Sequence, residues 1–172
     1  MKKLITFLFT ALLTVVIYSD SNAQFAKAGV GLMYGSEIEQ IGIRADGVYL
    51  INEDIRIVGD LGFFFPDKTE FGGGSSFTVT WWELNANGNY IFHADEEQGL
   101  TAYGLAGLNF TTVSVKSDDG TNTATNSDTE VGLNLGAGLE YGLDFADLFG
   151  ELKFVLSDAD QLNIGVGLRF PL

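Results

Sequence analysis

The stretch EVGLNLGAGLEY, residues 130–141, alternates apolar side chains with small or polar ones along its whole length. One parity holds Val131, Leu133, Leu135, Ala137, Leu139 and Tyr141, and the other holds Glu130, Gly132, Asn134, Gly136, Gly138 and Glu140. Successive side chains of a β-strand point to opposite faces of the sheet. The stretch therefore predicts a strand with one apolar face and one polar face.

The same alternation recurs along the chain. Eight strands are predicted, over residues 25–35, 40–51, 55–65, 77–92, 99–115, 130–143, 148–156 and 161–170. The first and fifth are more ambiguous than the others because they are rich in glycine and alanine. An even number of strands joined by short turns is typical of a barrel that closes on itself.

The position of the charged residues indicates which face points inward. Nine charges occupy the polar parity in the middle of strands: Arg44, Asp46, Arg56, Asp60, Glu83, Glu140, Glu151, Lys153 and Arg169. Soluble ligand-binding barrels keep apolar side chains inside, whereas membrane barrels place them outside and keep polar ones within. The sequence therefore predicts an all-β fold, an eight-stranded antiparallel up-and-down transmembrane β-barrel.

These nine charges are the candidate functional residues, as an interior charge network. Four are basic and five are acidic, so they nearly balance. Eight strands leave an interior that side chains just fill, and an unpaired charge there is costly. We expect a charge-paired, plugged interior. The alternative is that the same residues line a narrow ion path.

The first residues have the pattern of a signal peptide. Lys2 and Lys3 precede an apolar run over 4–18, and a small-x-Ala site ends at Ala23. The run is shorter than the roughly 20 residues of a spanning helix. We expect cleavage after Ala23, export to the outer membrane, and a barrel domain over 24–172. Cleavage would change the formal net charge from −14 to −15.

With the N-terminus in the periplasm, two long connections fall on the outer side. Residues 66–76 and 116–129 are rich in Gly, Ser, Thr, Asn and Asp, and are predicted to be flexible surface loops. Outward aromatic residues then form two groups, as the interfacial belts of membrane proteins do. The outer group is Tyr34, Phe63, Phe65, Trp82, Phe110 and Phe154, and the inner group is Tyr49, Tyr90, Phe92, Tyr141 and Phe170.

The signal peptide, the eight alternating strands, the short inner turns and the closing strand GVGLRF at 165–170 resemble the small OmpA/OmpX-like outer-membrane β-barrel superfamily. The resemblance covers essentially the whole mature chain. It implies contact with outer-membrane lipid, and assembly by machinery that reads a terminal aromatic residue. In this sequence Phe170 is that aromatic residue, and Pro171 and Leu172 follow it.

The sequence offers little for catalysis. It has no cysteine and one histidine, His93, which is predicted in an inner turn beside acidic residues. Barrel enzymes of the outer membrane use a histidine near the outer surface, so we expect no enzyme, and no catalytic, cofactor-binding or metal-binding residue. The Asp118-Asp119-Gly120 segment lacks the ligand spacing of an EF-hand. The strongly acidic chain has no basic stripe for nucleic acid.

Three functions are compatible with this sequence. The first is a non-enzymatic, monomeric outer-membrane barrel with a structural or surface-exposed role. The second is a surface-binding, adhesin-like barrel that acts through 66–76 and 116–129. The third is a soluble, lipocalin-like carrier of a lipophilic ligand, which requires the two faces to be reversed.

Overall fold

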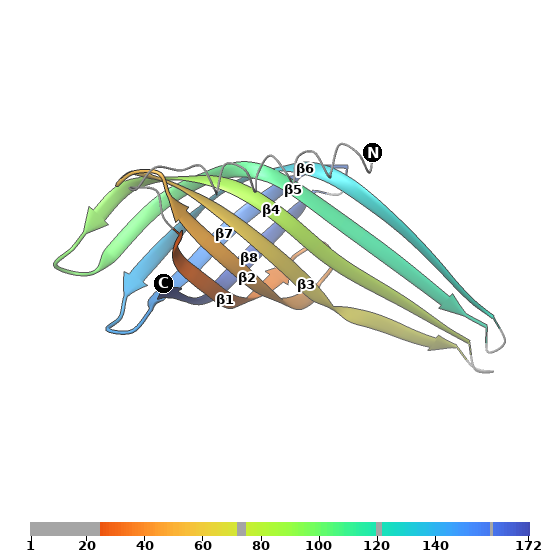
Figure 1. Cartoon of the computed structure of the whole chain (residues 1–172). Helices are drawn as coiled ribbons and strands as arrows, with labels where there is room; N and C mark the ends of the chain where they lie inside the picture. The colour runs from red at the N-terminus through yellow and green to blue at the C-terminus, as the bar shows by residue number, and fades with distance from the viewer. Residues whose placement is uncertain (1–24, 72–74, 120–121, 159) are drawn as a thin grey trace.

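Eight antiparallel strands close into one barrel, so the predicted fold is confirmed (Figure 1). The computed structural model describes residues 25–71, 75–119, 122–158 and 160–172. The strands are β1 (Phe25–Gly35), β2 (Gln40–Leu50), β3 (Ile55–Phe71), β4 (Ser75–Asp95), β5 (Leu100–Asp118), β6 (Thr123–Gly142), β7 (Asp147–Leu156) and β8 (Gln161–Pro171). Each pairs with its neighbours in sequence, and β1 pairs with β8 to close the ring. The expected signal peptide and its cleavage site lie outside the described residues.

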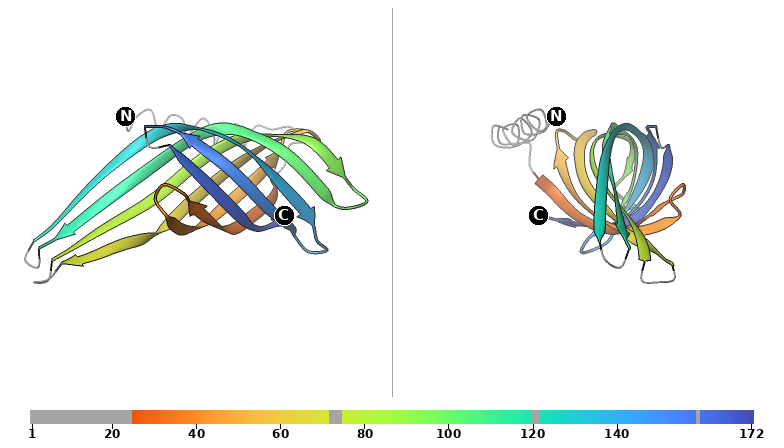
Figure 2. Two further views of the ribbon diagram at one scale, coloured as in Figure 1. Left: turned by 180° about the vertical axis from the view of Figure 1, so that it is seen from behind. Right: turned by 90° about the vertical axis from the view of Figure 1, so that its right-hand side faces the viewer.

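Side-chain exposure alternates along the strands and is inverted relative to a water-soluble protein. On β6, Leu133 and Leu135 are 57% and 59% exposed, whereas Asn134 between them is 2% exposed. The same holds on β7, where Leu152 is exposed and both Glu151 and Lys153 are buried. The polar parity therefore faces the interior of the barrel, whose ring of strands is seen end-on in the right-hand view of Figure 2. No helix among the described residues has the length and apolarity needed to cross a membrane.

Most of the predicted outward aromatic residues are exposed on the barrel surface. Phe110 and Tyr49 are half-buried instead. The exposed ones are Tyr34, Phe63, Phe65, Trp82 and Phe154 in the outer group, and Tyr90, Phe92, Tyr141 and Phe170 in the inner group. The register places Phe63 directly beside Trp82 on neighbouring strands, and Tyr49 contacts the ring of Phe25 edge-on at 5.6 Å.

Four strands continue past one end of the barrel, which we call the hairpin end, and this corrects the two predicted loops. Most of 66–76 and 116–129 is strand, and these residues extend the β3–β4 and β5–β6 hairpins. Beyond Phe64, β3 pairs only with β4, and β6 has no β7 partner before Leu133. The result is a four-stranded projecting sheet, formed by the β3–β6 residues beyond those two points (Figure 1).

The projecting sheet is built from polar residues that still suit strands. Threonine is β-branched and fits a pleated, solvated surface, so a run rich in Thr and Ser reads as a loop by polarity but forms a ladder. Thr112 bonds to Thr129 and Ser114 bonds to Ser127 across β5 and β6, each at 2.8 Å between hydroxyl oxygens. Such cross-strand pairs stabilise a sheet.

The opposite end of the barrel, the turn end, holds the short connections. The β4–β5 turn contains Gly99 with φ of 65°, a backbone conformation that glycine adopts without strain. His93 lies in β4 rather than in this turn, since β4 runs to Asp95. Its predicted place in a turn is therefore wrong, although it is exposed near the turn end.

Close strand approach inside the barrel makes a glycine on β6 sensitive to substitution. A Cβ on Gly136 would overlap the carbonyl oxygen of Leu152 and lie 3.0 Å from the Cα of Lys153. We expect Gly136→Ala to lower the free energy of unfolding by about 1–3 kcal/mol. Gly150→Ala on β7 is the matched control, because a Cβ there meets no atom within 4 Å. Urea titration of both variants in lipid vesicles checks this, and equal stabilities would contradict it.

Candidate functional site

The structure places all nine predicted network residues in the barrel interior, where each is buried. They come from β2, β3, β4, β6, β7 and β8. Each sits at an inward position because strand parity leaves it no other direction. The charged cluster occupies the half of the barrel toward the turn end, and a layer of amide side chains adjoins it toward the hairpin end.

Arg169 on β8 is at the centre of the cluster. Its Nη2 donates to Oδ2 of Asp46 at 2.9 Å, and its Nε lies 3.2 Å from both oxygens of the same carboxylate. Its Nη1 donates to Glu140, and Nη2 lies 3.9 Å from Glu151. The guanidinium also lies over the ring of Phe149, 4.3 Å from its centroid. One cation therefore joins three carboxylates from three strands.

Two further arginines complete the pairing. Arg56 makes a two-point contact with Glu140, with nitrogen–oxygen distances of 2.9 and 2.7 Å. Arg44 donates to Glu151 at 2.8 Å and to Asp46 at 3.2 Å. Forked contacts of this kind are stronger and more directional than those of a lysine.

Tyr103 and Phe149 are interior members of the site that the sequence analysis missed. Tyr103 lies under Arg56, 4.4 Å from ring centroid to guanidinium carbon, and its hydroxyl donates to Glu151 at 3.0 Å. Phe149 shares the inward parity of Glu151, which could have identified it. Tyr103 lies on the glycine-rich fifth strand, where the alternation is weak.

The layer toward the hairpin end is held mainly by amides. Asp60 accepts hydrogen bonds from Asn85 at 2.8 Å and from Asn87 at 3.2 Å. Asn134 donates to both of these asparagines at 2.8 Å. Lys153 places its ammonium 3.8 Å from Asp60 and 3.7 Å from Glu83. Amide side chains both donate and accept, so they link to one another where charges are few, although Asn134 Oδ1 has no hydrogen-bond partner among the described residues.

A partly buried lysine closes the charge balance at the turn end. Lys27 of β1 lies 3.5 Å from Glu140 and 2.6 Å from Asp147. Each of the five acidic network residues has one of the four network cations within 4.0 Å, and Lys27 adds a third cation beside Glu140. Pairing and hydrogen bonding offset the cost of burying these carboxylates. The described residues include no group of three or more histidine, cysteine, aspartate or glutamate side chains arranged to hold a metal ion.

Comparison with solved structures identifies the architecture. A major outer membrane protein from Thermus thermophilus matches with a TM-score of 0.67 and 14% identity, over 88% of this chain and 100% of that one. The chain has the fold of the small outer-membrane β-barrels. Ail of Yersinia pestis, in complex with the heparin analogue sucrose octasulfate, matches this barrel with a TM-score of 0.60 and 15% identity, over 84% and 97% of the two chains.

A third small outer-membrane barrel gives the same picture. Neisserial surface protein A matches with a TM-score of 0.58 and 18% identity, over 88% of this chain and 100% of that one. No protein-family model matches the sequence, and no curated protein does. The OmpA/OmpX-like resemblance is thus one of strand number, pairing and closure.

Proposed function

We propose that this chain is a non-enzymatic, monomeric outer-membrane β-barrel that is exported with cleavage after Ala23 and has a structural or surface-exposed role. The observation that carries the proposal is the inverted exposure of the strands. Leu135 on β6 is 59% exposed, whereas Arg169 in the interior is fully buried. Water disfavours such an apolar exterior, and a bilayer favours it.

The closed sheet also meets the requirements of hydrocarbon. Lipid offers no hydrogen bonds to the backbone, so a spanning sheet has to pair every edge. The ring from β1 to β8 does so over the barrel. We further propose that the chain contacts outer-membrane lipid and is assembled by the barrel-assembly machinery, which would read Phe170.

A soluble carrier of a lipophilic ligand suits this interior poorly. A lipocalin-like function requires an apolar cavity, whereas nine charged side chains fill the inside of this barrel. Placing a lipophilic ligand there would separate ion pairs such as Arg56–Glu140 and leave buried charges uncompensated.

Cell fractionation tests the location directly. The full precursor is expressed in a bacterium with an outer membrane, and the envelope fraction is run on a denaturing gel with and without boiling. We expect a heat-shifted band in the outer membrane and a mature N-terminus at Gln24. A freely soluble, unshifted periplasmic protein would refute the proposal.

We further propose that the interior is plugged rather than conducting. Arg44, Arg56 and Arg169 each pair across the interior with a carboxylate from a strand that is not their neighbour in the ring. Purified protein in planar bilayers is therefore expected to give no stable unitary current steps. Large, regular steps would support the ion path that the same residues could line.

The projecting sheet favours a second candidate function, capture of an extracellular partner. The outer edge of β3 beyond Phe64 and that of β6 before Leu133 have no strand partner in the described part of the barrel. Exposed edges present backbone groups that another chain can pair with. Lys68 and Glu70 lie on the first edge 2.5 Å apart, and this contact holds the pKa of Glu70 below its usual value.

Trimming the projecting sheet separates the two functions. Residues 115–126 are replaced by Asn-Gly, which joins the paired residues Ser114 and Ser127 through a tight turn. The variant is expected to keep its heat-shifted mobility. If cells that carry it adhere to a protein-coated surface as well as cells that carry the full chain, surface binding through the β5–β6 hairpin of this sheet is excluded.

A further inference from the structure

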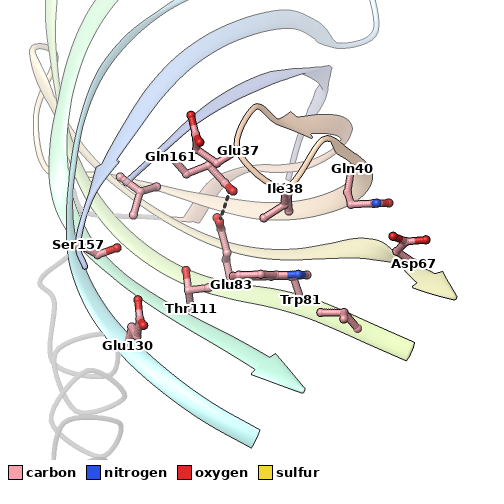
Figure 3. Close-up of a pocket in the computed structure, with 12 residues that line it drawn as sticks. Glu37, Ile38, Gln40, Asp67, Trp81, Glu83, Thr111, Glu130, Ser157 and Gln161 are labelled. Carbon is pink, nitrogen blue, oxygen red and sulfur yellow. Dashed lines mark hydrogen bonds between the residues drawn. The ribbon is translucent and has the colours of Figure 1, made fainter. Parts of the chain in front are cut away.

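A cavity of about 380 Å³ opens at the hairpin end of the barrel, above the amide layer (Figure 3). Its walls come from the turn between β1 and β2, the bases of β3 to β6 in the projecting sheet, and the adjoining ends of β7 and β8. This volume falls in the range of small-molecule sites, roughly 300–1,000 Å³. Of the nine network residues beneath the cavity, only Glu83 lines it.

The cavity is acidic, and the described residues that line it include no basic side chain. Glu37, Asp67 and Glu130 line it from three different elements. None of these three takes part in an ion pair between described residues. Glu83 at the floor is different, because it already accepts hydrogen bonds from Asn163 at 3.0 Å. Three carboxylates thus give the cavity an uncompensated negative potential.

The lining also has an apolar part. Trp81, Val79, Val155 and Ile38 contribute it, and Figure 3 shows the Trp81 ring beside Glu83 with the other carboxylates spread around the opening. Tryptophan is the aromatic side chain that attracts cations best through its ring face. The cavity therefore has an apolar wall that includes an indole ring, and a rim of negatively charged side chains.

We propose that this cavity binds organic ammonium ions that carry an aromatic or aliphatic body. The apolar part of such a ligand would lie against Trp81 and Val79, and its positive charge would face Asp67, Glu130 and Glu37. The spread of the carboxylates suits a diffuse organic cation better than a compact metal ion, which needs converging oxygen ligands. Polyanions would be repelled by the same rim.

The probe is benzyltrimethylammonium, a permanent cation that is smaller than the cavity. The chain has two tryptophans, so Trp82→Phe leaves Trp81 as the only one and its fluorescence reports on the cavity. Trp82 points to the outer surface and does not line the cavity. Titration of the refolded Trp82→Phe barrel in zwitterionic nanodiscs is expected to give a saturable change. Benzyl alcohol and benzoate are expected to give none.

Charge removal distinguishes this site from general attraction to an acidic protein. Asp67→Asn with Glu130→Gln is expected to weaken binding at least about fivefold, since each removes a cation contact at a partly exposed position. Glu96→Gln with Glu97→Gln removes the same charge at the exposed β4–β5 turn and is expected to leave binding unchanged. Both pairs are first checked for heat-shifted mobility.

Three results would overturn the proposal. One is a Trp81 signal that does not saturate with benzyltrimethylammonium. Another is an equal response to the neutral or anionic probe. The last is an equal loss of affinity in the two double variants, which would mean that only the net charge of the chain matters.

Discussion

Arg169→Met is expected to lower the free energy of unfolding of the barrel by about 3–5 kcal/mol, the usual cost of leaving buried charges without their partner. Arg169 joins two separate parts of the network, through its hydrogen bonds to Asp46 and Glu140. Glu140 keeps Arg56 in the variant, whereas Asp46 keeps only the longer contact from Arg44 at 3.2 Å. The loss is therefore concentrated on Asp46.

Urea unfolding in lipid vesicles measures the effect of Arg169→Met. Lys68→Met is the control, because the Lys68–Glu70 pair lies exposed on the projecting sheet and solvent-screened pairs of this kind contribute little to stability. Adding Asp46→Asn to Arg169→Met is expected to recover part of the lost stability by removing the stranded carboxylate. If Arg169→Met unfolds at the same urea concentration as the unmodified barrel, the network is not what stabilises the interior.

Leu135→Arg is expected to destabilise the barrel by about 2–4 kcal/mol, the cost of an arginine on the lipid face near the middle of a bilayer. Leu135 is 59% exposed on β6, and along that strand it lies between Val131, which pairs with Phe110 of the outer group, and Tyr141 of the inner group. In a water-soluble barrel the same change on an exposed position would cost little. The sign and size of the effect therefore report which medium surrounds the strand.

The matched control for Leu135→Arg is Thr125→Arg, on the same strand but in the projecting sheet. Thr125 is exposed beyond the barrel, so its variant is expected to stay within about 0.5 kcal/mol of the unmodified chain. Refolding yield into vesicles, read from the heat-shifted band, provides a second measure. Equal stability of Leu135→Arg and Thr125→Arg would place the β6 face in water.

Strand parity explains why so much of the barrel could be predicted from sequence. A residue such as Glu140 between Leu139 and Tyr141 has one direction available once either neighbour is placed, so inward positions follow without knowledge of the fold. Which charged residues form ion pairs with one another does not follow from parity. Arg169 meets Asp46 because of the register between β8, β1 and β2, which depends on closure of the ring, and it meets Glu140 because of the register between β8, β7 and β6.

The two predicted loops show where polarity misleads. The segments around Thr69 and Thr125 are as hydrophilic as a loop, but their β-branched residues and neighbouring hairpins extend the ladder. The cavity at the hairpin end could not be predicted from the sequence either. Asp67, Trp81 and Glu130 come together there only because β3 to β6 project beyond the barrel.

Nuclear Overhauser contacts between side-chain methyl groups and lipid acyl chains test the central claim, the inverted arrangement of the strands, most directly. Leu105 and Leu108 on β5 form a matched pair, with exposures of 3% and 43%. In nanodiscs we expect acyl-chain contacts from the methyl groups of Leu108, Leu133 and Leu135, and none from Leu105 or Val58. Acyl-chain contacts from Leu105 and Val58, with none from the β6 leucines, would contradict the account.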